Sequence, residues 1–129
     1  ILIANPHPYT LNRHSRCIEQ CELIKKPGLN VLDAPGNDLI ASTALATSGC
    51  QIIMFTTGRG TPFSTVVPTL KIATNDRIAN AKKGWIDFNA YGMDDRALFD
   101  LVMKTANGEY KAKQEDSHEI AFFKKGVTL

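Results

Sequence analysis

CQIIMFT, residues 50–56, is apolar almost throughout and leads directly into the polar, glycine-containing stretch TGRGT at residues 57–61. Such a short apolar run predicts a β-strand that is buried on both of its faces, as strands of parallel sheets are. The glycines and threonines that follow predict a loop at the carboxyl end of this strand.

The segments on either side alternate in pattern between strand and helix. We expect strands over residues 29–34, 69–73 and 85–89, a strand or connector over 1–9, and a last apolar element over 120–123. Periodic apolar positions predict helices over residues 12–26, 39–48, 76–83 and 94–107. This alternation predicts an α/β fold with a mostly parallel sheet flanked by helices, a Rossmann-like three-layer sandwich.

Composition limits the class of protein. The length of 129 residues suits one domain, and 15 basic against 13 acidic side chains give a net charge of only +2. So balanced a charge argues against a nucleic-acid partner, and the apolar runs are too short for a membrane span. Three cysteines and no visible signal peptide favour a soluble protein of the reducing cytoplasm. Because the chain begins with Ile1, we expect it to be a piece of a longer protein.

The loop after the apolar strand has the composition of an anion site. Its glycines let backbone N–H groups turn inward, its threonines add hydroxyl groups, and its arginine suits a carboxylate or phosphate. The alternative is a polar surface turn. A lysine in the next predicted strand is either a substrate contact or an ordinary lysine of an edge strand. The candidate binding residues here are Thr56, Thr57, Gly58, Arg59, Gly60, Thr61 and Lys71.

A second polar loop follows the predicted strand over residues 29–34. Asp33 and Asp38 are candidates for holding a divalent metal or for proton transfer, and Asn37 is a candidate substrate contact. The alternative is turn chemistry with a helix N-cap at Asn37 or Asp38. Scattered histidines and the three cysteines fit surface and packing positions better than metal ligation: His7, His14, His118, Cys17, Cys21 and Cys50.

Several blocks of the sequence occur together in a recognisable order. They are GLNVLDAPGND at 28–38, FTTGRGTPF at 55–63, VPT at 67–69, KIATN at 71–75, WIDFNA at 85–90 and FKKGVTL at 123–129. In this order they resemble the C-terminal domain of the altronate/galactarate dehydratase family. The resemblance covers residues 28–129, while residues 1–27 read as a connector and helix. Ser64 and Tyr91 depart from it, because each stands where the family has glycine.

The resemblance implies part of a hydro-lyase that removes water from D-altronate, giving 2-dehydro-3-deoxy-D-gluconate, with galactarate as the alternative substrate. It also implies a divalent metal, Fe²⁺ or Mn²⁺, and further N-terminal domains of the same chain, without which this part is inactive. No catalytic base is assigned from the sequence. The competing interpretation is a non-catalytic domain that binds a sugar acid or forms a homodimer.

Overall fold

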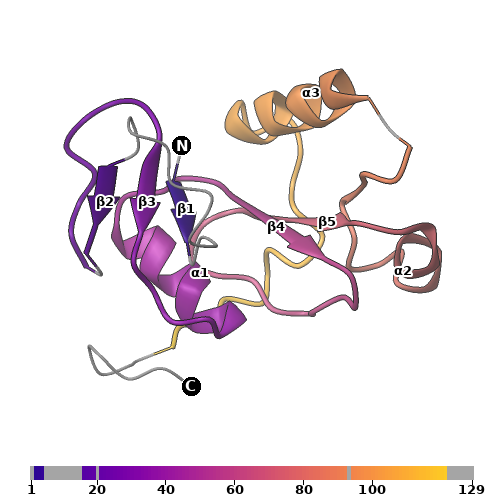
Figure 1. Cartoon of the computed structure of the whole chain (residues 1–129). Helices are drawn as coiled ribbons and strands as arrows, with labels where there is room; N and C mark the ends of the chain where they lie inside the picture. Colours follow the sequence, from indigo (N-terminus) through magenta and orange to yellow (C-terminus); the bar gives the residue numbers. More distant parts are fainter. Residues whose placement is uncertain (1, 5–15, 20, 93, 122–129) are drawn as a thin grey trace. The chain divides into compact units, whose positions relative to one another are not determined.

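The computed structural model describes residues 2–4, 16–19, 21–92 and 94–121. The chain divides into two compact units, one formed by Ile1–Gln51 with Glu119–Leu129 and the other by Ile52–His118. Each unit contains a three-stranded sheet in which every strand pair is parallel (Figure 1). Among the described residues, no helix has the length and apolar character needed to cross a membrane.

The first unit places a helix against a small sheet. The strands β1 (Leu2–Ala4), β2 (Arg16–Ile18) and β3 (Asn30–Leu32) pair in the order β1-β3-β2. Helix α1 (Asp38–Thr47) begins at the predicted N-cap Asn37, whose side chain accepts from the N–H of Ile40. The buried core combines strand and helix residues: Ile18, Leu32, Ala34 and Ala44. Ala44, with its small side chain, is the residue that α1 contributes to this core.

The helix predicted over residues 12–26 is wrong where the structure describes that segment. Arg16–Ile18 forms strand β2 and pairs with Asn30–Leu32, and Cys21 has a φ of +68°. An L-residue in this left-handed conformation interrupts any α-helix. The apolar spacing is helical, but the β-branched Ile18 is instead completely buried in the core of the sheet. Tertiary burial therefore overrides the local pattern.

The second unit contains the strands predicted from the centre of the sequence. They are β4 (Ile53–Thr57), β5 (Thr69–Ala73) and β6 (Phe88–Asn89), in the order β4-β5-β6. Helix α2 (Asp76–Ala81) follows β5 and contributes Ile78 to a core with Ala73 and Ile86. Figure 1 shows β4 and β5 side by side. In their parallel register Phe55 pairs with Lys71.

The position of each strand in this sheet corrects the prediction about which strand is buried on both faces. Strand β4 is not buried on both faces, because Met54 is 53% exposed. The fully buried strand is β5, which lies between its two neighbours while β4 lies at an edge.

Parallel pairing and the α/β class are confirmed, but the single sheet of a Rossmann-like sandwich is not, since the described strands form two sheets. One domain over residues 1–129 stays a prediction.

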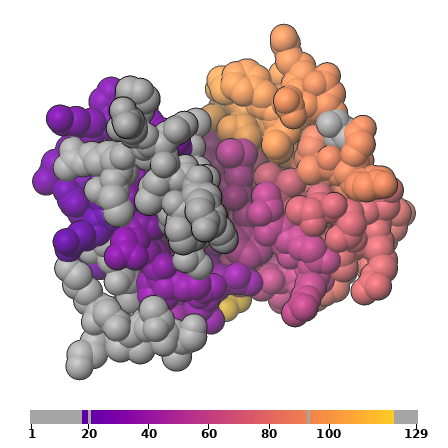
Figure 2. Space-filling view, viewed as in Figure 1, coloured from indigo at the N-terminus to yellow at the C-terminus, as the bar shows by residue number. Residues whose placement is uncertain are grey.

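Helix α3 (Asp95–Ala106) begins where the sequence places it, with Asp94 as N-cap. On one face of the helix Thr105 is buried and Leu98, Leu101 and Val102 are partly covered. Phe99 lies outside this face and is 60% exposed. Figure 2 shows α3, in orange, at the surface of the second unit.

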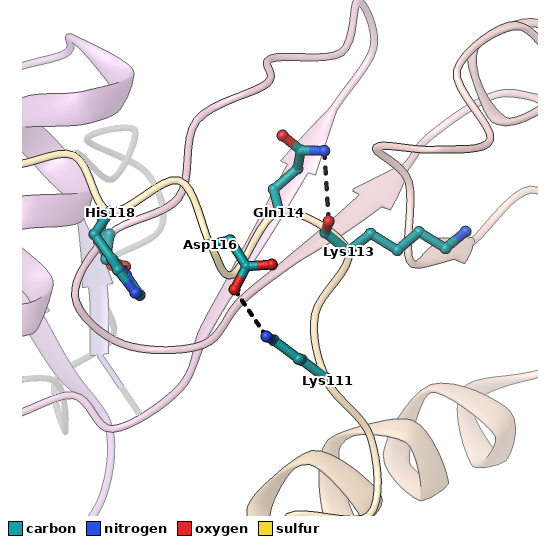
Figure 3. A network of polar contacts seen from close by, with 6 residues as sticks. Lys111, Lys113, Gln114, Asp116 and His118 are labelled. Atoms are coloured by element: carbon teal, nitrogen blue, oxygen red, sulfur yellow. Dashed lines mark hydrogen bonds and ion pairs between the residues drawn. The ribbon is translucent and has the colours of Figure 1, made fainter.

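One carboxylate joins the segment after α3 to the sheet of the second unit. Asp87 accepts hydrogen bonds from the hydroxyl of Tyr110 at 2.8 Å, the backbone N–H of Lys113 at 2.9 Å and the backbone N–H of Lys71 at 2.7 Å. Further along, Lys111 pairs with Asp116 at 2.8 Å (Figure 3). That hydrogen bond raises the pKa of Lys111 and lowers the pKa of Asp116. Asp87 therefore joins this charged segment to the central strand.

Replacing Asn75, the N-cap of α2, tests how the helix is fixed. Its Oδ1 accepts from the N–H of Ile78 at 3.0 Å, so Asn75→Ala should lower the free energy of unfolding by about 1–2 kcal/mol. Asn75→Asp keeps a capping oxygen and should retain most of that contribution. Urea denaturation of the three proteins measures both effects. An equal loss in both variants would contradict capping as the main role of this side chain.

Alkaline pH tests the Tyr110–Asp87 contact. Burial, and then the hydrogen bond to Asp87, raise the pKa of Tyr110. The folded state then holds this proton more tightly than the unfolded state, so the stabilisation is complete below the unfolded pKa of about 10 and is lost above it. Between about pH 10 and 11, unfolding free energy should fall more steeply in the wild-type chain than in Tyr110→Phe. Equal slopes in urea denaturation would show that the contact does not perturb this hydroxyl.

Candidate functional site

The three strands of the second unit all run parallel, so their carboxyl ends lie together at one end of the sheet. We call this end the carboxyl edge. Strand β4 ends at Thr57, and the backbone N–H of Thr74, directly after β5, donates to the carbonyl of Thr57 at 3.1 Å. Asn89, which ends β6, donates to Asp76 at 2.6 Å. Polar groups from three separate parts of the sequence therefore meet at this edge, which is where α/β proteins bind their ligands.

The loop after β4 is organised by the hydroxyl of Thr57. Its Oγ1 accepts the backbone N–H of Gly60 at 2.8 Å and that of Arg59 at 3.3 Å. The glycine pattern predicts that N–H groups of this loop face an anion, but these two are already bound to Thr57. Arg59 itself is exposed. The guanidinium of Arg59 is therefore the group of this loop best suited to bind a carboxylate.

Side chains at the N-cap and the C-cap of α2 bind carbonyl groups of this loop. Asn75 Nδ2 donates to the carbonyl of Gly58 at 3.2 Å, and Lys82 Nζ donates to the carbonyl of Gly60 at 3.3 Å. The ammonium of Lys82 also lies 4.4 Å from the centroid of the Trp85 ring, a cation–π contact. Sequence reasoning misses Asn75, Lys82 and Trp85 as parts of the site. The rule that parallel strands end together would have found Asn75, but not the other two.

Gly60 is glycine for a conformational reason. Its φ is +80°, a left-handed conformation that other residues rarely adopt. A Cβ at this position would also lie 2.8 Å from Cδ of Lys82. The backbone at Gly60 thus turns tightly while the stem of Lys82 covers it.

Lys71 is not a lysine of an edge strand. It lies in the central strand β5, its side chain is completely buried, and its Nζ donates to the carbonyl of Phe63. The same ammonium lies 4.5 Å from the ring centroid of Phe63 and 5.9 Å from that of Phe55. These contacts connect the buried face of β5 to the segment after the loop. A substrate contact at Lys71 stays a prediction.

The candidates from the other polar loop belong to the first unit. Asn37 is the N-cap of α1, which confirms the capping alternative for this residue. Asp33 and Asp38 are both exposed, Asp38 in the first turn of α1. Within the described part of the chain, no three His, Cys, Asp or Glu residues gather closely enough to hold a metal ion. These residues alone therefore do not fit a metal site, and metal binding by the two carboxylates stays a prediction.

The remaining candidates are distributed around the fold. Thr56 is exposed and, by strand alternation, faces away from Thr57, while Thr61 is half-buried. His118 is exposed as expected, with Nδ1 3.2 Å from the carbonyl of Thr65. Burial raises the pKa of the Cys50 thiol, which agrees with an inert cysteine. His7, His14 and the side chain of Cys17 lie outside the described residues.

Known proteins resemble this chain over most of its length. It is 51% identical to the altronate dehydratase of Bacillus subtilis over 118 residues and 48% identical to that of Escherichia coli over 117 residues. Each comparison covers 84% of this chain and 24% of the relative. The L-threo-forming galactarate dehydratase of Escherichia coli is 39% identical over 66 residues, covering 50% of this chain and 13% of the relative. The chain therefore spans about a quarter of the length of the altronate dehydratases.

A family described as "D-galactarate/Altronate dehydratase, C-terminal" matches residues 12–128. The sequence blocks that resemble the family begin at residue 28, but this match begins earlier. It therefore includes most of the segment over residues 1–27 that the sequence predicts to be a connector and helix. It also contains both polar loops and the sheet edge that carries Arg59. The chain belongs to the D-galactarate/altronate dehydratase family, as its C-terminal region.

Proposed function

We propose that this chain is part of a sugar-acid dehydratase, and that Arg59 binds the carboxylate of the substrate. The observation that carries the proposal is the position of Arg59. It is exposed in a loop that two hydrogen bonds to Thr57 hold at the carboxyl edge of a parallel sheet. A guanidinium held there presents a planar pair of donors that matches a carboxylate. The family and the identity to altronate dehydratases supply the class of reaction.

The reaction is the dehydration of D-altronate to 2-dehydro-3-deoxy-D-gluconate. A proton leaves C2, hydroxide leaves C3, and the resulting enol becomes the C2 ketone, with one water released. Negative charge builds up next to the carboxylate as the C2 proton leaves. A positive group fixed at the carboxylate stabilises that charge in the transition state more than in the ground state. This is the role proposed for Arg59.

Two parts of the proposal reach beyond this chain. The family resemblance supports a divalent metal, Fe²⁺ or Mn²⁺, and domains supplied by the rest of a longer enzyme, since the related dehydratases are about four times as long. The described residues alone do not fit a metal site. A reducing cytoplasm is the proposed location, in keeping with the free thiols of Cys21 and Cys50.

The substrate is proposed as altronate ahead of galactarate. Identity to the altronate dehydratases extends over 84% of the chain, against 50% for the galactarate dehydratase. Galactarate carries a second carboxylate at C6, where altronate has a hydroxyl group. The loop around Arg59 binds one carboxylate and does not by itself distinguish altronate from galactarate.

A chimeric enzyme tests the role of Arg59. In it, this chain replaces the matching region of the Bacillus subtilis altronate dehydratase. We expect the chimera to dehydrate altronate faster than galactarate, and Arg59→Ala to lower kcat/KM by about a hundredfold, roughly 2.7 kcal/mol of transition-state stabilisation. Arg96→Ala is the matched control, because it removes the same charge from an exposed position on α3. Steady-state kinetics with both acids measures these effects.

Two outcomes would contradict the proposal. The first is a folded chimera that binds altronate without turning it over, which would favour a non-catalytic binding domain. The second is an Arg59→Ala chimera whose kcat/KM equals that of Arg96→Ala. In that case the loop is structural and the carboxylate is bound elsewhere.

A further inference from the structure

We propose that Lys82 is a positioning residue for Arg59, which it fixes through the carbonyl of Gly60 without binding the substrate. This inference rests on the proposed function, because it assigns to Lys82 the task of holding the loop that presents Arg59. Lys82 comes from the far end of α2, 22 residues after Gly60 in the sequence.

The backbone of Lys82 is fixed by its neighbours. Its N–H donates to the carbonyl of Ile78 at 2.9 Å, at the end of α2. Its own carbonyl accepts the N–H groups of Trp85 at 2.9 Å and Ile86 at 3.1 Å. Ile86 in turn is buried in the core of the second unit. The side chain of Lys82 therefore starts from a rigid point.

The side chain is held at its other end as well. The ammonium lies over the Trp85 ring at 4.4 Å and donates to the carbonyl of Gly60 at 3.3 Å. The stem passes so close to Gly60 that a Cβ there would lie 2.8 Å from Cδ of Lys82. A long lysine side chain loses much rotational freedom when it is held in this way, and the aromatic contact offsets part of that cost.

These contacts brace the loop from two sides. Inside, Thr57 Oγ1 accepts the N–H groups of Arg59 and Gly60. Outside, Lys82 binds the carbonyl of Gly60. Thr57 and Asn75 thus bind the two peptide groups that flank Arg59, and Lys82 binds the next peptide group, at Gly60, while the side chain of Arg59 stays exposed. Because a small misplacement of a substrate-binding group costs much of its catalytic effect, such a brace is a functional requirement.

A double-mutant cycle in the chimeric enzyme tests whether Lys82 acts through Arg59. We expect Lys82→Met, which keeps the length but removes the charge, to lower kcat/KM for altronate by about tenfold, mainly through KM. In the Arg59→Ala background the same substitution should change kcat/KM by less than about twofold, since the group being positioned is gone. Lys82→Arg keeps a donor and a cation over the ring and should restore most of the activity. The exposed neighbour supplies the control, Lys83→Met.

Amide hydrogen exchange of the 129-residue chain gives a readout that is independent of activity. Lys82→Met should speed exchange of the Gly60 N–H by about fivefold or more, because the brace outside the loop is lost. Exchange of amides in β5 should stay unchanged, which also shows that the variant folds. Lys83→Met should leave both rates unchanged.

The outcomes separate this inference from the proposed function. An equal loss from Lys82→Met with and without Arg59 would show that Lys82 binds the substrate itself, and would overturn the positioning role. The same holds if Lys82→Met matches Lys83→Met in both kinetics and exchange. If Arg59→Ala has no effect while the Gly60 amide responds to Lys82→Met, the brace stands and the proposed function fails.

Discussion

Parallel pairing of β5 with both of its neighbours is the constraint on which the candidate site depends. It sends the ends of β4, β5 and β6 to a single edge, so that residues far apart in the sequence meet there. The hydrogen bond from the N–H of Thr74 to the carbonyl of Thr57 extends this pairing just beyond the strands. The loop that carries Arg59 starts from that anchored point. A shift of register by one residue would turn the inward-facing Thr57 outward and leave the loop without its internal acceptor.

The sequence predicts the elements whose ends carry strong local signals. Helices α1 and α3 begin directly after Asn37 and Asp94, because these side chains cap the first turn, and such caps depend on a few neighbouring residues alone. The position of β5, the loop after β4 and the exposed Arg59 are likewise visible in the sequence. Each rests on residues that lie close together in the sequence.

The features that the sequence misses depend on contacts between distant segments. Residues 16–18 have helical spacing but form a strand, since burial of Ile18 beside Leu32 decides their conformation. Met54 is exposed because β4 lies at the edge of its sheet, which the apolar run around it does not reveal. Lys82, the partner of Gly60, comes from 22 residues away, and its place in the sequence gives no hint of this contact. The division of the strands into two sheets likewise depends on contacts between distant segments.

Trp85 is the only tryptophan of the sequence, and it lies beside the ammonium that holds Gly60. Indole emission responds to a positive charge near the ring and to the polarity around it. The chain therefore contains its own optical probe at the braced loop, without any added label. Titration with a sugar acid while the fluorescence of Trp85 is followed would report directly whether the surroundings of the loop change when the acid binds.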